Sequence, residues 1–141
     1  MSGSHMIFGS IIPGAAYQAR PAAYAVITGD GGTIAVVGYK GRYFLPGGGS
    51  LPGEAPEETV EREVREELAR GVRITGRISK AIQYFPADGR HYRMEAVFFA
   101  AEFTGEPTGE GEHQLHWLDP GEIEQAFFHE SHAWAARLAV R

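Results

Sequence analysis

The stretch PGGGSLPGEAPEETVEREVREELA, from Pro46 to Ala69, decides the fold of this chain. Seven of its residues are glutamates, and only Arg62 and Arg65 carry positive charge. Carboxylates one helical turn apart repel each other and weaken a helix. The density of acids directly behind a glycine-rich segment therefore needs a physical explanation.

The second half of this stretch predicts an amphipathic helix. Pro56 suits the first helical position, where its missing N–H would have no partner in any case. Val60, Val64 and Leu68 recur at i, i+4 and i+8 and form one apolar stripe. The preceding residues, 46–53, contain four glycines and two prolines. We therefore expect a loop over 46–53 and a helix over 56–69.

The position of three glutamates on this helix predicts a metal site. At roughly 100° per residue, Glu63, Glu66 and Glu67 fall on one arc beside the apolar stripe. Carboxylates this close to a core are costly unless they are paired or coordinated, and two arginines cannot neutralise all of them. Mg²⁺ takes oxygen ligands and joins carboxylates to substrate phosphates. The alternative is a solvated acidic face, which is the usual meaning of a charge run.

The rest of the chain sets limits on its class. Its 141 residues and net charge of −5 predict one domain and argue against a general nucleic-acid binder. The start, Met1–His5, resembles an expression-tag remnant, so we expect the domain to cover residues 6–141. The longest apolar run, 96–101, is far short of the roughly 18 residues that span a bilayer. The absence of cysteine excludes disulfides and thiolate metal sites and fits the cytoplasm.

The apolar runs predict a mixed domain. Residues 22–28 and 33–40 flank a Gly/Asp turn and predict a β-hairpin. Further elements are expected as strands at 42–45, 72–85, 93–103 and 113–119, and as helices after Pro120 and at 131–140. The order β-β-β-α-β-β-β-α-α indicates a mixed α/β or α+β domain.

The spacing of the charged residues resembles a known family motif. Gly48, five residues, Glu54, seven residues and REVREE at Arg62–Glu67 resemble the Nudix box, Gly-x5-Glu-x7-Arg-Glu-aliphatic-x-Glu-Glu-x-Gly-aliphatic. Ala69 replaces the glycine of the box and Arg70 its last aliphatic residue. We therefore expect the helix to end slightly late, with the exit loop shifted and the glutamates intact. Ala55 replaces the usual Ser or Thr cap, a loss of about 1 kcal/mol.

The resemblance implies a fold and a set of site residues. The fold is an α/β/α sandwich around a mixed sheet. The activity is hydrolysis of a nucleoside diphosphate linked to another group, with Mg²⁺ or Mn²⁺. Arg62 is expected to pair with Glu54 and Glu63 and to hold them in place, and Glu63 to act as the general base or to orient it. The implied metal ligands are the Gly47 carbonyl and the side chains of Glu63, Glu66, Glu67 and Glu112.

Two further assignments carry alternatives. Glu112 is chosen as the additional carboxylate because relatives often place a glutamate shortly before a Trp-Leu strand. Glu110 is the alternative, and both could be solvated loop residues. His129 and His132 have a spacing that can bind metal, but no third nitrogen ligand is evident, so we expect surface or capping roles. Trp117 is expected in the core.

The substrate follows from the resemblance less directly. The short chain is most similar to the MutT-like branch, which takes nucleoside triphosphates. The alternatives are ADP-ribose, nucleotide sugars, dinucleoside polyphosphates, or nucleotide sensing without catalysis. Sensing modules often lose box glutamates, and here Glu63, Glu66 and Glu67 are all present. A small nucleotide is thus the expected partner, with no nucleic-acid polymer and no membrane. A homodimer is one option, because Nudix relatives are often dimers.

Overall fold

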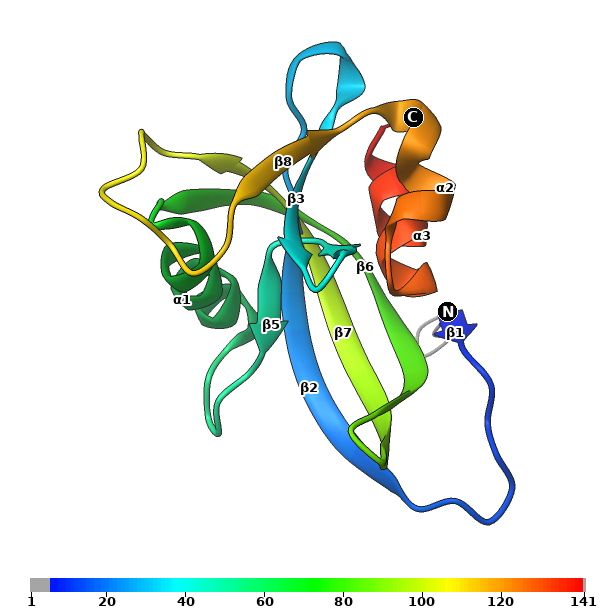
Figure 1. The fold of residues 1–141 in the computed structure, drawn as a ribbon. Coiled ribbons are helices and arrows are strands. Elements are labelled where there is room, and N and C mark those ends of the chain that lie inside the picture. The colour runs from blue at the N-terminus through cyan, green and yellow to red at the C-terminus, as the bar shows by residue number, and fades with distance from the viewer. Residues whose placement is uncertain (1–5, 141) are drawn as a thin grey trace.

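A computed structural model describes residues 6–140 (Figure 1). The expected tag remnant, Met1–His5, lies outside the described residues. The strands are β1 Met6–Phe8, β2 Tyr17–Val26, β3 Ile34–Tyr39, β4 Arg42–Phe44, β5 Gly47–Gly49, β6 Val72–Ala87, β7 Arg90–Phe103 and β8 Leu115–Leu118. The helices are α1 Pro56–Leu68, α2 Ile123–Ala126 and α3 Glu130–Ala139.

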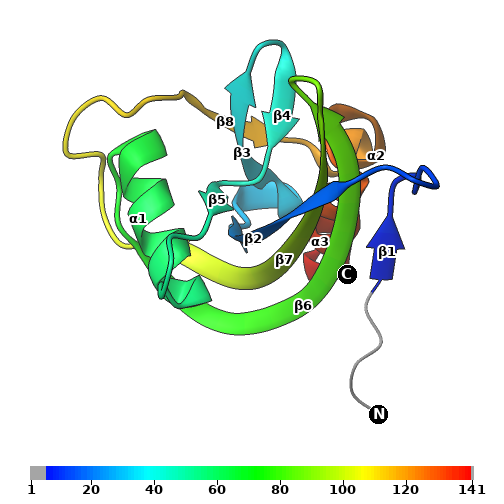
Figure 2. The same ribbon diagram turned by 90° about the horizontal axis from the view of Figure 1, so that it is seen from below.

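The strands form two sheets, which helices cover on opposite sides. The larger sheet has the order β1-β6-β7-β2-β5 and is mixed, because β2 runs parallel to β7 while β6 and β7 are antiparallel. The smaller sheet has the order β4-β3-β8. Helix α1 lies on one side of the molecule, and α2 and α3 lie on the other (Figures 1 and 2). The predicted mixed α/β architecture is therefore confirmed.

Strand β2 stands between the two halves of the core. Alternate side chains of a strand point to opposite faces, so β2 contributes to both. Ala22, Tyr24 and Val26 join the apolar cluster under α3. The intervening residues join the cluster under α1, which also holds the whole predicted helix stripe: Ala23, Ala25, Val60, Val64 and Leu68. Each fully buried aliphatic side chain of the stripe contributes roughly 1.5–3 kcal/mol.

The predicted hairpin over 22–40 is only partly right. The turn forms, because the Gly29 N–H donates to the Thr33 carbonyl at 2.8 Å and Thr28 bridges Ile34. Beyond the turn, however, β2 and β3 enter different sheets. The reason is that all ten residues of β2 pair with β7, and this long-range ladder outweighs the local hairpin.

Helix α1 does not end late, so that expectation is wrong. Leu68 is its last residue, and Ala69 caps it in the left-handed region at φ 55°. The Ala69 carbonyl accepts bonds from the Thr108 N–H at 2.8 Å and the Thr108 hydroxyl at 3.1 Å. These contacts hold an alanine in a conformation that costs roughly 1–2 kcal/mol for a residue with a Cβ.

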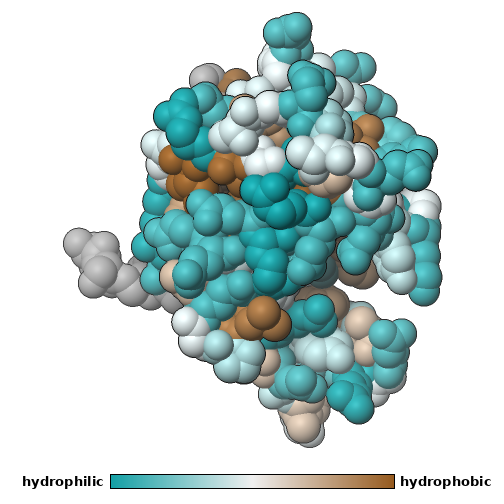
Figure 3. All heavy atoms as spheres, turned by 90° about the vertical axis from the view of Figure 1, so that its left-hand side faces the viewer, coloured by the Kyte–Doolittle hydropathy of each residue, from teal (hydrophilic) through white to brown (hydrophobic). Residues whose placement is uncertain are grey.

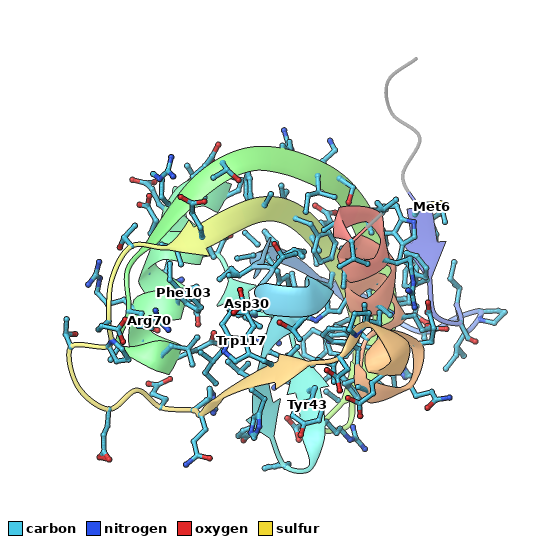
Figure 4. All side chains as sticks on the ribbon, turned by 90° about the horizontal axis from the view of Figure 1, so that it is seen from above. Met6, Asp30, Tyr43, Arg70, Phe103 and Trp117 are labelled. Atoms are coloured by element: carbon cyan, nitrogen blue, oxygen red, sulfur yellow. The ribbon has the colours of Figure 1, made fainter. Side chains whose placement is uncertain are left out.

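Arg70, the residue after this cap, stands where the motif has an aliphatic side chain, and it covers the Phe103 ring with its guanidinium group. Its guanidinium carbon lies 3.9 Å from the centre of the Phe103 ring (Figure 4), and its Nε donates to the Gly105 carbonyl at 2.9 Å. Trp117 packs edge-on to the same ring, but 44% of it is exposed. The expectation that Trp117 lies in the core is wrong, because it sits on the solvent-facing side of β8.

Within residues 6–140, no helix combines the length and the apolar character needed to cross a membrane.

Candidate functional site

The site begins at the short strand β5, which the sequence predicted as loop. The Gly47 N–H donates to the Glu67 carboxylate at 3.0 Å, so β5 and α1 are joined at this point. Gly47 has φ 143°, and a Cβ there would lie 2.2 Å from the Ala23 carbonyl oxygen. A Cβ on Gly48 would lie 2.8 Å from the Glu63 carboxyl carbon. Glycine is therefore needed for this backbone to lie against the two carboxylates.

An ion pair between Arg62 and Glu54 fixes the loop that precedes α1. Glu54 accepts bonds from the Arg62 Nε at 2.8 Å and Nη2 at 3.0 Å. It also accepts from the Leu51 N–H at 3.0 Å and the buried Thr59 hydroxyl at 2.8 Å. These hydrogen bonds, that of Arg62 above all, lower the pKa of Glu54 to about 2. Glu54 is thus fully ionised and serves as an anchor.

Arg62 also reaches the predicted metal-binding glutamates. Its Nη1 donates to Glu63 at 3.0 Å and to Glu66 at 3.3 Å, and its Nη2 donates to the Gly49 carbonyl at 2.9 Å. Burial raises the pKa of Glu63, and the bond from Arg62 opposes that shift. A single guanidinium therefore stands among three carboxylates and neutralises only part of their charge.

Glu67 is the buried acid of the cluster. Only 8% of it is exposed, and it receives the Gly47 N–H described above. Among the residues that the structure describes, no basic side chain forms an ion pair with it. Burial above all, together with the charges of Glu63, Glu112 and Glu66, raises the pKa of Glu67 to about 8, while the bond from the Gly47 N–H opposes that shift. Glu67 is thus an acid without a counter-charge.

The loop between β7 and β8 brings Glu112 to the same place. The Glu112 N–H donates to the Glu66 carbonyl at 3.0 Å and the His113 N–H to the Glu67 carbonyl at 2.9 Å. These carbonyls belong to the last turn of α1 and have no partner within the helix. A Cβ on Gly111 would lie 2.1 Å from the Glu67 carbonyl oxygen, so only glycine permits this docking. Glu110 lies in the same loop, and both Glu110 and Glu112 are exposed.

The carboxylates of this site do not form a single cluster. Within residues 6–140, no three acidic or histidine side chains lie close enough together to form a ready-made metal site. Arg62 bonds to both Glu63 and Glu66, and 46% of the Glu66 side chain is exposed, so it has room to turn. The donor set nevertheless fits a hard divalent cation, because it consists of carboxylate oxygens around one unpaired buried acid.

A cavity of about 210 Å³ opens beside Glu67 and Gly47. Sequence reasoning missed its other walls, which come from β2, β3, the end of β4 and the β7–β8 loop: Tyr24, Val37, Tyr39, Phe44 and His113. A larger groove of about 740 Å³ follows between the β3–β4 turn and residues 107–116. Hydrophilic side chains cover most of the face around α1 (Figure 3). The cavity is thus an apolar recess next to an acidic surface.

The two histidines are neither exposed nor capping, contrary to the expectation. His129 is 5% exposed and His132 is fully buried, and neither side chain caps α3. Both rings pack among aromatic side chains, including Phe44. Both lie on the inner side of the chain, because α3 packs against the core there.

The sequence resembles those of known proteins. A family model described as NUDIX domain matches residues 18–139. Over 37 residues the chain is 49% identical to the nucleoside triphosphatase NudI of Enterobacter sp. (strain 638), and this match spans about a quarter of the length of that curated relative, 26%.

Solved structures share the fold over most of the chain. The MutT NUDIX hydrolase from Burkholderia pseudomallei has a TM-score of 0.68 and 27% identity, covering 86% of this chain and 98% of that one. An ADP-ribose pyrophosphatase from Streptococcus suis 89-1591 has a TM-score of 0.67 and 16% identity, covering 86% and 89%. At that identity the second likeness shows the fold alone.

Proposed function

The chain belongs to the NUDIX family of pyrophosphohydrolases, and from this premise we propose that it hydrolyses nucleoside triphosphates with Mg²⁺. The products would be a nucleoside monophosphate and pyrophosphate. The family uses divalent cations, so the choice of Mg²⁺ over Mn²⁺ and the choice of substrate are the proposed parts.

The observation that carries the proposal is the buried carboxyl group of Glu67, which no basic side chain among the described residues pairs with. Arg62 is already committed to Glu54, Glu63 and Glu66, while Glu67 is buried without a counter-ion. An ionised carboxylate is costly to bury unless it is paired or coordinated, and for that reason Glu67 keeps its proton up to a pKa of about 8 in the metal-free protein. A divalent cation supplies the missing charge, and a polyphosphate supplies the remaining oxygen ligands.

We propose that the residues that would hold the metal come from α1, the start of β5 and the β7–β8 loop. They are the Gly47 carbonyl and the carboxylates of Glu63, Glu66, Glu67 and Glu112. When bound, the metal would activate a water molecule and neutralise the charge that develops on the phosphate oxygens.

The remaining roles belong to the protein's own groups. Glu63 takes the proton of the attacking water, or orients the group that does. Arg62 holds Glu63 in place through the bond at 3.0 Å and is itself anchored by Glu54. The Gly47 N–H, by donating to one oxygen of Glu67, fixes the rotation of that carboxylate. A preorganised set of this kind lowers the cost of reaching the transition state.

Nucleoside triphosphates are favoured over the other substrate classes by two likenesses. The short match to NudI and the longer match to the Burkholderia MutT protein both point to this branch. The recess beside Glu67, with its aromatic walls, suits a planar base next to the acidic site. Because these nucleotides are cytoplasmic metabolites, we place the enzyme in the cytoplasm, where it acts on small nucleotides as a monomer or a homodimer.

A substrate screen tests the proposal. The protein is incubated with Mg²⁺ and either nucleoside triphosphates, oxidised ones included, ADP-ribose, nucleotide sugars or dinucleoside polyphosphates. Released phosphate is measured after addition of a coupling phosphatase or pyrophosphatase. We expect the highest kcat/KM for a nucleoside triphosphate. A clear preference for ADP-ribose or a nucleotide sugar would overturn the substrate, and binding of nucleotides without turnover would indicate a sensor.

A further inference from the structure

The segment Leu45–Gly47 links β4 to β5 and carries the backbone of the site. Three different elements hold it, and Gly47 in addition pairs with Tyr24 in the β2–β5 ladder. The Pro46 carbonyl accepts from the Ala25 N–H of β2 at 2.8 Å, and the Gly47 N–H donates to Glu67 of α1 at 3.0 Å. The Leu45 N–H donates to the Nδ1 of His132 in α3 at 3.1 Å. Helix α3 thus reaches the acidic site through one side chain.

The bond to His132 is the only polar contact of that side chain within the described residues. His132 is fully buried, and its Nε2 has no hydrogen-bond partner there. Its ring packs against Tyr24 at 4.2 Å and His129 at 5.0 Å between centroids. Because Nδ1 accepts a hydrogen bond, the neutral ring carries its proton on Nε2. A buried donor without a partner is costly, so apolar packing alone does not account for a histidine here.

The chain geometry gives this bond a specific consequence. Leu45 is fully buried, and a buried N–H needs an acceptor. The next residue, Pro46, has no N–H, and Gly47 is held by pairing with Tyr24 in the β2–β5 ladder, so the Leu45 N–H is the donor that ties the start of the segment to α3. We propose that His132 is a positioning residue for the metal site, which holds Leu45 so that Gly47 meets Glu67. This inference rests on the proposed function, because it treats Gly47 and Glu67 as metal ligands.

Three variants separate this role from simple core filling. His132→Leu keeps an apolar side chain of similar bulk but removes the acceptor. His132→Asn places an oxygen where Nδ1 stands, because both atoms follow Cγ, and so keeps the acceptor. Ala136→Gly weakens α3 at a fully buried position and leaves the Leu45 bond in place, which makes it the control for general destabilisation.

The first measurement is hydrogen exchange of single amides by NMR in metal-free protein. We expect exchange of the Leu45 and Gly47 amides to rise at least tenfold in His132→Leu relative to Ala136→Gly, and to return towards the parent rate in His132→Asn. Exchange at Gly47 within twofold of the control would overturn the proposal. If His132→Leu does not fold, the hydrogen bond is tested in the parent by the scalar coupling between the Leu45 amide nitrogen and His132 Nδ1. A missing coupling would overturn the proposal.

The second measurement is the Mg²⁺ concentration that half-saturates the thermal shift. Loss of an outer partner of metal ligands typically costs 10- to 100-fold in affinity, so we expect about tenfold for His132→Leu and rescue in His132→Asn. Unchanged affinity would overturn the link to the metal site. If the parent shows no Mg²⁺ response, the proposed function fails, and the exchange result alone decides whether His132 positions the segment.

Discussion

Replacing Glu67 by glutamine tests whether this residue is a buried acid without a counter-charge. The side-chain oxygen of glutamine can still accept the Gly47 N–H bond, which is 3.0 Å long in the parent. The substitution removes the carboxylate whose pKa is raised by burial to about 8. It therefore separates the hydrogen bond, which is kept, from the ionisable carboxyl group, which is lost.

The expected gain in stability follows from proton linkage. Between the ordinary pKa of 4.5 and about 8, the folded state binds a proton that the unfolded state releases. Parental stability therefore falls as pH rises through this window. At 1.36 kcal/mol per pKa unit, the metal-free glutamine variant should exceed the parent by up to about 3 kcal/mol at pH 7 and by less than about 1 kcal/mol at pH 5. For a chain of this length, 3 kcal/mol corresponds to about 10 °C in Tm.

Thermal unfolding followed by circular dichroism measures this difference, with EDTA and then with Mg²⁺. The parent should gain stability with Mg²⁺ by mass action, about 2.7 kcal/mol at a hundredfold excess over Kd, and the Glu67→Gln variant should gain little. Glu61→Gln, an exposed glutamate of the same helix, is the matched control. A glutamine variant that is less stable than the parent at pH 7 in EDTA would refute the assignment of Glu67 as an unpaired buried acid.

Three further predictions concern other parts of the structure. Ala69→Gly should raise the free energy of unfolding by up to about 1 kcal/mol, measured by urea titration. The reason is that Ala69 is held at φ 55°, where glycine is unstrained. A loss of stability would contradict the observed cap. Arg62→Lys should lower turnover 10- to 100-fold, because a lysine ammonium cannot donate to Glu54 and Glu63 at the same time as the planar guanidinium does. The control Arg65→Lys, at an exposed position, should match the parent. Equal rates for the two variants would argue against the role of Arg62. Burial lowers the pKa of His129 to about 4, so between pH 6.5 and 4 the unfolded state binds a proton that the folded state does not. Acidification across this window should therefore lower the free energy of unfolding by about 3 kcal/mol. The His129→Leu variant should lose less stability in the same titration, and an identical acid sensitivity would count against a buried neutral ring.

The local features of the site were predictable from the sequence because their signals are local. The stripe Val60, Val64 and Leu68 defines both the helix and its buried face, so the arc of glutamates follows from helical geometry. The Arg62 side chain lies within reach of Glu54 because only seven residues, the end of the loop and the first turns of the helix, lie between them. These parts of the account needed no knowledge of the remaining chain.

The other features depend on contacts between distant segments. Nothing in the sequence of β2 shows that it pairs with β7 and not with β3. The Gly/Asp turn after β2 favours pairing with β3, whereas the ten-residue ladder favours β7. The position of Glu112 depends on N–H groups of its loop meeting free carbonyls at the end of α1. The burial of His129 and His132 depends on α3 packing against the core, which their spacing does not reveal.

The most direct test of the central claim is turnover of a nucleoside triphosphate as a function of Mg²⁺ concentration, for the parent, Glu67→Gln and Glu61→Gln. We expect the parent rate to rise from none in EDTA to a plateau, the Glu61→Gln rate to follow the parent, and the Glu67→Gln rate to fall at least about a hundredfold while the variant remains folded. Parental turnover that persists in EDTA, or a Glu67→Gln rate equal to that of the parent, would contradict it.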